Sequence, residues 1–158
     1  MNSDFNVAVH GLVYLSHHEG TLSSELLARN ICTNPARVRK VMSRLGRAGI
    51  IRTKEGLEGG YQLARPAGEI TLEQISRALD VEFVRTGWKS GDPCKTCLIA
   101  AGMGEAMDAL YARLDGLCKD YLTGVTVQSV AEHIFGKARS GGEDPCRLSG
   151  ENNTKKEN

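Results

Sequence analysis

The sequence predicts a mainly α-helical protein with one small β-hairpin and one long helix near its C-terminal end. Three patterns in the chain support this fold class. A basic segment that starts at residue 35 carries apolar residues at the spacing i, i+3, i+4 and i+7, which is typical of one face of a helix. Two short apolar runs then flank the glycine-rich segment KEGLEGG, as expected for a hairpin. A heptad pattern of apolar residues in the last third of the chain predicts a long helix that packs against another helix.

The first three helices are predicted from their caps and breakers. Residues 5–15 are apolar between polar flanks and should form a helix. Ser23 can cap a short second helix, because a serine oxygen accepts a hydrogen bond from an unpaired N–H of the first turn. Asn34 and Pro35 fit the N-cap and first position of a third helix, where proline lacks only an N–H that has no partner anyway. Gly49 ends this helix, and its buried stripe consists of Val38, Val41, Met42 and Leu45.

A hairpin and a fourth helix follow. We expect strands at residues 50–53 and 61–63, and Thr71 begins the capping-box pattern TLEQ of the next helix. A short helix, a tight turn, a second helix and a hairpin together describe a winged helix-turn-helix. The sequence therefore predicts such a domain over residues 1–82.

The C-terminal half should contain an irregular loop at residues 83–95, which we interpret as a sensor loop, and a region at 96–136 with the long helix and a short final helix capped by Thr126. Residues 137–158 are polar and glycine-rich, so we expect a disordered tail. The heptad positions predict a homodimer interface. The alternative is a helix packed within one chain on the winged domain, but that domain already has apolar stripes of its own. The predicted interface residues are Met103, Met107, Leu110, Leu114, Leu117 and Tyr121.

Positive charge is concentrated in one segment of a nearly neutral chain. The formal net charge is +1, yet seven basic residues and no acidic residue lie between Pro35 and Lys54. The basic face of the third helix lies opposite its apolar stripe, as needed for a helix that enters the major groove of DNA, and the hairpin glycines allow backbone N–H groups to approach phosphate. A solvated surface face, or a face that binds an acidic protein partner, is the alternative. The predicted DNA-binding residues are Asn34, Arg37, Arg39, Lys40, Ser43, Arg44, Arg47, Lys54, Gly59, Gly60 and Tyr61.

Residues 5–82 resemble the Rrf family of bacterial winged-helix transcriptional regulators, with its IscR, NsrR and CymR types. The resemblance rests on the segment LLARNICTNPARVRKVMSRLGRAGIIRTKEGLEGGYQLARP and on EITLEQISRAL after it. With the long helix included it covers roughly residues 5–135, and it implies homodimers that bind dyad-symmetric operators. IscR-type relatives usually carry an arginine before the wing tip, where this chain has Glu55 beside Lys54. They also carry acidic and amide residues in place of Arg39 and Lys40, so a different operator is expected.

The segment DPCKTC places two thiols at the start of the long helix, whose dipole favours the thiolate form. Cys94 and Cys97 are therefore a candidate sensor with three possible uses. The resemblance implies a 2Fe–2S cluster in this loop, which His10 of the other subunit would complete because Ala100 stands where IscR-type proteins have a histidine. A disulfide between the two thiols, or with Cys118 across the dimer, is equally open. Structural zinc needs four ligands and is less well supported.

Other classes of protein fit less well. A thioredoxin-like oxidoreductase would need a βαβ unit around its CxxC motif, and no phosphate loop or catalytic triad is evident, so we expect no enzyme. No apolar run approaches the roughly 18–20 residues that span a bilayer, and the N-terminal residues lack the basic start of a secretion signal. We therefore expect a cytoplasmic, cysteine-regulated DNA-binding homodimer that carries a 2Fe–2S cluster or no cofactor. The sequence leaves open the operator, the signal, and whether transcription is repressed or activated.

Overall fold

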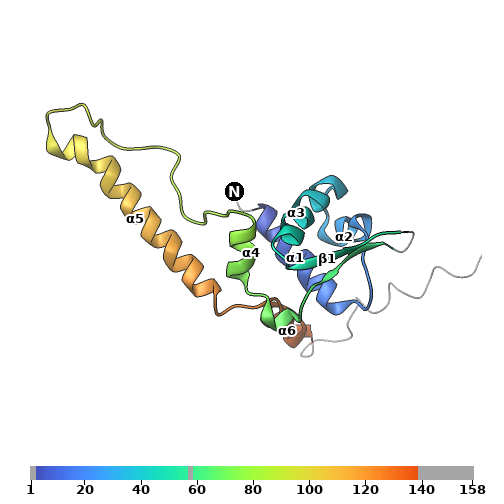
Figure 1. Cartoon of the computed structure of the whole chain (residues 1–158). Coiled ribbons are helices and arrows are strands. Elements are labelled where there is room, and N and C mark those ends of the chain that lie inside the picture. The colour runs from blue at the N-terminus through green and yellow to red at the C-terminus, as the bar shows by residue number, and fades with distance from the viewer. Residues whose placement is uncertain (1–2, 57–58, 139–158) are drawn as a thin grey trace, which may run out of the picture.

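The computed structural model describes residues 3–56 and 59–138. It is mainly helical with a single two-stranded antiparallel hairpin (Figure 1), which confirms the predicted fold class. The predicted tail of residues 137–158 lies outside the described residues from residue 139 onward, and residues 137 and 138 still belong to the last helix. The elements are α1 (Ser3–His17), α2 (Ser24–Ile31), α3 (Pro35–Arg47), β1 (Ile51–Lys54), β2 (Gly60–Leu63), η1 (Ala67–Glu69), α4 (Leu72–Ala78), α5 (Leu98–Leu122) and α6 (Val127–Ala138).

The predicted helix caps are confirmed. Ser23 Oγ accepts a hydrogen bond from Leu26 N at 3.2 Å, and Asn34 Oδ1 accepts one from Ala36 N at 2.7 Å. Thr71 forms the predicted capping box with the fourth residue of the TLEQ motif. These contacts fix where α2, α3 and α4 begin, because each satisfies an N–H that the helix itself cannot pair.

Helices α1, α2 and α3 form one side of a continuous apolar core. Leu12 of α1, Leu27 of α2 and the Met42 and Leu45 side chains of α3 are fully buried in it. Helices α1 and α3 approach closely at Gly11, where a Cβ atom would lie 2.6 Å from Met42 Cε. The packing therefore fixes the orientation of α3 relative to the body of the domain.

The hairpin lies beside this helical unit, and its strands differ by a residue from the prediction. Ile50 is outside β1, because its N–H pairs with Leu45 O to close the end of α3 after Gly49, whose φ is +69°. Tyr61 of β2 also exchanges two backbone hydrogen bonds with Leu22, which precedes α2. The hairpin is thus attached to the α1–α2 connection as well as to its own strands.

Helix α6 packs back onto the N-terminal unit. Val127 is fully buried, and its N–H donates to Ile70 O at 2.9 Å, while Leu72 N donates to Val125 O at 2.8 Å. The winged unit therefore includes the last helix of the described chain, although about 50 residues separate that helix from α4 in the sequence.

Helix α5 extends away from the winged unit. It lies within the region 96–136 predicted to contain the long helix, and its N-terminal end is the part farthest from the other helices in Figure 1. Most of its apolar side chains are exposed in the single chain, including Leu110, Leu117 and Tyr121. None of the helices in the described ranges combines the length and apolar character that crossing a membrane requires.

Candidate nucleic-acid interface and cysteine loop

Helix α3 presents one apolar and one basic face. Val38, Val41, Met42 and Leu45 are at most 1% exposed. Lys40, Ser43 and Arg47 are exposed on the other side of the helix, and Arg44 is half-buried. The structure thus separates the two faces as the apolar spacing predicts, and the cationic groups lie at the surface.

Arg37, at the first turn of α3, is held by the start of α1. Its Nε donates to Asp4 Oδ1 at 2.8 Å, and its Nη2 lies 2.7 Å from the same oxygen and also donates to Ser3 Oγ. The carboxylate partly neutralises the charge of the Arg37 guanidinium, and the hydrogen bonds to both partners fix its orientation. In this structure Arg37 links α3 to α1.

Arg39 belongs to a second network, at the start of α2. Its Nη1 donates to Ser24 Oγ at 3.0 Å and to Glu25 Oε1 at 3.1 Å, and Ser24 Oγ donates to Glu25 Oε2 at 3.1 Å. The backbone N–H of Glu25 and the Ser24 hydroxyl lower the pKa of Glu25, which stays a carboxylate. Two of the predicted DNA-binding arginines therefore have acidic partners within the chain.

The other cations of α3 are arranged differently. Within the described part of the chain, Lys40, Arg44 and Arg47 form no ion pair. Their charges are uncompensated at short range, so these three side chains can respond to a phosphate or a base edge without first losing a partner.

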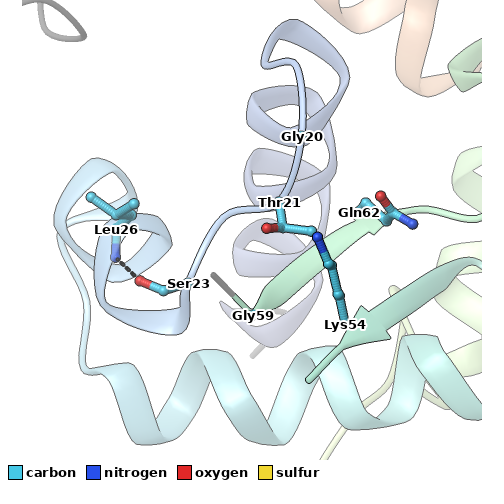
Figure 2. A pocket seen from close by; sticks show the side chains of 7 residues that line it. All are labelled: Gly20, Thr21, Ser23, Leu26, Lys54, Gly59 and Gln62. Carbon is cyan, nitrogen blue, oxygen red and sulfur yellow. Dashed lines mark hydrogen bonds between the residues drawn. The ribbon is translucent and has the colours of Figure 1, made fainter. Parts of the chain in front are cut away.

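An open hollow of about 590 Å³ lies between the start of α2 and the hairpin (Figure 2). Ser23 and Leu26 line it on the side of α2, and Lys54 and Gln62 line it on the side of the hairpin. Gly20, Thr21 and Gly59 complete the lining. The lining of the hollow is polar and apolar in similar measure, and it includes the ammonium group of Lys54.

The two hairpin glycines of the predicted DNA-binding set have a structural explanation. A Cβ on Gly60 would lie 2.5 Å from Leu22 O, and one on Gly59 would lie 2.6 Å from Lys54 O. Tyr61, the next residue, is half-buried and pairs with Leu22. The close backbone approach alone therefore requires glycine at both positions.

Cys94 and Cys97 lie at the tip of the molecule, where a loop folds onto the first turn of α5. Both thiols are exposed, and Cys97 is the N-cap residue of α5. Backbone N–H groups of Ala100 and Ile99 lower the pKa of Cys97, which favours the reactive thiolate. Asp92 holds the loop, because its carboxylate accepts from Cys94 N at 2.9 Å and its N–H donates to Ala100 O at 2.8 Å.

The four predicted sensor residues do not gather within one chain. Cys118 follows Cys97 by 21 residues of the same helix, which corresponds to about 30 Å at 1.5 Å per residue. His10 lies on α1, where its Nε2 is 2.8 Å from Asn30 Oδ1. Across residues 3–56 and 59–138, no group of three or more His, Cys, Asp or Glu side chains is placed to hold a metal ion.

The sequence profile of the Rrf2 family, described as an iron-dependent transcriptional regulator, matches residues 1–133. The chain belongs to the Rrf2 family. Its membership confirms the resemblance drawn from the GGYQLARP segment, and it makes the protein a transcriptional regulator by family.

Rrf2 relatives match over most of the chain. YwnA of Bacillus subtilis is 28% identical over 135 residues, which cover 85% of this chain and 99% of YwnA. A crystal structure from Lactobacillus plantarum superimposes with a TM-score of 0.73 at 25% identity, covering 90% of this chain and all of that one. The structure of CymR, the global cysteine regulator of B. subtilis, gives a TM-score of 0.62 at 20% identity over 84% of this chain and 96% of CymR, and supports the fold alone.

Three acidic residues of this Rrf2 protein were absent from the predicted site. Asp4 and Glu25 hold the two arginines described above, and the buried Asp115 of α5 accepts hydrogen bonds from Phe83 N at 2.6 Å and Val84 N at 3.2 Å. Asp115 also pairs with Lys119 at 2.7 Å. The sequence offered only weak signals for them: Asp4 and Glu25 lie in the first turns of their helices, and Asp115 stands four residues before Lys119.

Proposed function

We propose that this Rrf2-family regulator is a homodimer that binds a dyad-symmetric DNA operator with α3 of each protomer in the major groove. The observation that carries the proposal is the face of α3, where Lys40, Arg44 and Arg47 are accessible and have no acidic partner among the described residues, while the opposite side is fixed in the core. A rigid helix with free cations on one face matches the geometry by which winged-helix proteins read base edges.

Different residues would have different roles in this complex. Ser43, Lys40, Arg44 and Arg47 would contact base edges and phosphates of the groove. The hollow beside the hairpin, with Lys54, would receive the flanking phosphate backbone, because backbone and side-chain donors at a loop are typical phosphate contacts. Asn34, which caps α3, and the tightly packed Gly59, Gly60 and Tyr61 would support this surface and position the hairpin.

The dimer would form through α5. A stable interface buries about 800 Å² per partner, and one winged unit offers less DNA contact than specific binding needs. Exposed apolar side chains repeat along α5 at heptad spacing, as in helices that pair with a second copy. The proposed interface residues are Met103, Met107, Leu110, Leu114, Leu117 and Tyr121.

We also propose that Cys94 and Cys97 form the sensor. Both are exposed, and Cys97 has the lowered pKa of a reactive thiol. A 2Fe–2S cluster takes four ligands, and one chain supplies two thiols in this loop, so a cluster would need donors from the partner subunit. The structure of one chain does not complete that ligand set. The thiol pair alone suffices for a disulfide, in which both thiols lose their protons and two electrons pass to an external oxidant such as a peroxide.

Two measurements test these proposals. Selection from a random DNA pool by the full-length protein should enrich one dyad-symmetric sequence, and binding should weaken steeply as salt rises. Failure to enrich any DNA sequence would contradict the proposed function. Binding to a protein whose affinity does not fall steeply with salt would instead indicate a protein-binding adaptor. Anaerobic purification with an iron assay and an absorbance spectrum then separates a cluster from a dithiol switch.

A further inference from the structure

The network of Glu25, Ser24 and Arg39 connects the start of α2 to the exposed side of α3. Its three hydrogen bonds are 3.0 to 3.1 Å long and join Arg39 Nη1, Ser24 Oγ and both Glu25 oxygens. Ser24 is only 8% exposed, so one corner of the network is fixed in the fold. The side chains of Arg39 and Glu25 are 54% and 59% exposed, so the other two corners face solvent on the side of α3 proposed to meet DNA.

An exposed carboxylate is costly at a surface that binds phosphates. It repels the DNA backbone. Because the guanidinium is already paired with it, the approach of this guanidinium to a phosphate also releases less than one counterion from the DNA. An exposed surface ion pair itself contributes little to stability, typically about 0–1 kcal/mol. Neither phosphate affinity nor fold stability therefore accounts for the pair.

Base recognition does account for it. A guanidinium has five N–H donors in a fixed plane, and the network uses Nη1 of Arg39 only. The remaining donors on Nη2 and Nε can pair with O6 and N7 of a guanine, which is the common specific contact of arginine in the major groove. Holding one edge of the guanidinium also limits its rotation, so the other edge is presented in one direction.

We propose that Glu25 is a specificity-determining residue of the DNA-binding surface: it holds the Arg39 guanidinium for a guanine edge and suppresses its binding to phosphates of arbitrary sequence. This inference rests on the proposed DNA-binding function and deepens it. It distinguishes Lys40 and Arg47, which have no acidic partner among the described residues and would bind phosphates, from Arg39, which is paired with an acid and would read a base.

The test compares Glu25→Gln with the wild-type protein on two duplexes, the sequence enriched by selection and a shuffled duplex of the same composition. Glutamine removes the charge, but its carbonyl oxygen can still accept from Arg39, and its NH2 group can donate to Ser24 Oγ where a Glu25 oxygen accepted. On the shuffled duplex the variant should bind about five to ten times more tightly near 0.1 M salt, and the slope of log K against log salt should steepen by about 0.9, because one more phosphate contact forms. The ratio of affinities for the two duplexes should fall accordingly.

Two further variants complete the experiment. Glu132→Gln removes an exposed carboxylate of α6 that bonds to Gln128, and it controls for the change in net charge. In the double variant Glu25→Gln, Arg39→Ala the gain on shuffled DNA should disappear, because the freed guanidinium is its source. An unchanged slope and ratio in Glu25→Gln would overturn the inference, as would an equal loss on both duplexes, which indicates a structural role only. A wild-type protein without any sequence preference would instead contradict the proposed function.

Discussion

Individual arginines of α3 differ in what they can offer to DNA. Arg37 and Arg39 are each held by an acid from another helix, while Arg44 is half-buried beside the core and has no acidic partner among the described residues. Arg44 is therefore partly packed against the protein, and no acid among the described residues neutralises its guanidinium.

Arg44→Ala should weaken binding to the selected operator by about 1–3 kcal/mol if this side chain reads a base edge. Shuffled DNA should lose much less affinity. Fluorescence anisotropy with both duplexes measures the difference. Equal losses on the two duplexes would mean that Arg44 contacts phosphate.

Gly91 is the residue on which the shape of the cysteine loop depends most directly. Its φ is +84°, and a Cβ atom would lie 2.1 Å from Ala100 O, which is backbone and cannot move away independently of α5. The same carbonyl accepts the hydrogen bond from Asp92 that folds the loop onto the helix.

Gly91→Ala should separate the loop from the first turn of α5 and raise the pKa of Cys97 toward that of an ordinary thiol. The thiolate absorbance of Cys97 can be titrated in a variant that keeps it as the single cysteine. Gly87→Ala in the same loop is the matched control, because a Cβ there meets nothing within 4 Å. If both variants titrate alike, the Gly91 contact does not shape the sensor.

At the scale of elements, the ends of helices were predictable and the links between helices were not. Ser23, Asn34 and Thr71 cap through residues two or three positions away, so their role can be seen in a short stretch of sequence. Phe83 and Asp115 are 32 residues apart, and the hydrogen bond between them depends on how α5 returns to the winged unit. Local patterns therefore predicted α3 and its two faces, but not the acids that hold its arginines.

Asp115 anchors α5 to the chain that leaves α4. Burial would raise the pKa of Asp115, but hydrogen bonds from Lys119, Val84 and Phe83 outweigh burial and hold it below the usual value of 3.8. A carboxyl with a depressed pKa stabilises the folded state above the pKa of the unfolded chain, and this contribution is lost as pH falls through the folded pKa.

Asp115→Asn should therefore lower the free energy of unfolding by about 1–3 kcal/mol at neutral pH, since the acceptor of the Phe83 and Val84 N–H groups loses its charge and the ion pair with Lys119 is lost. As pH falls below about 4, the wild-type protein should lose this stabilisation. The free energies of unfolding of the two proteins should then converge. Urea unfolding across this range measures both effects. Asp108→Asn is the control, because Asp108 is an exposed carboxylate of α5 paired with Lys89; a similar loss in that variant would remove the special role of Asp115.

At the scale of the whole molecule, the chain consists of a packed winged unit and one projecting helix (Figure 1). The fold class and the heptad spacing could be predicted from sequence, because periodicity is a property of one helix. The return of α6 onto α1 could not, since it depends on the backbone hydrogen bonds that join Val125 and Val127, at the α5–α6 connection, to Leu72 and Ile70.

Leu117→Glu should convert the proposed dimer into a monomer, because it places a charge on the apolar face of α5. Leu117 is 54% exposed in the single chain, so the winged unit should remain folded. Sedimentation equilibrium measures the association, and circular dichroism checks the fold. Ala112→Glu adds the same charge on the opposite, exposed side of α5 and should leave association unchanged; dissociation by both variants, or by neither, would contradict the assigned interface.

The fixation of α5 near one end has a mechanical consequence. Asp115 lies 18 residues from Cys97. At a rise of 1.5 Å per residue, Cys97 is therefore about 27 Å along the helix from Asp115. On an arm of that length, a tilt of only about 6° at Asp115 carries the free end through about 3 Å, which is the span of one hydrogen bond. A small change of angle where α5 meets the winged unit therefore produces a much larger displacement at the two cysteines.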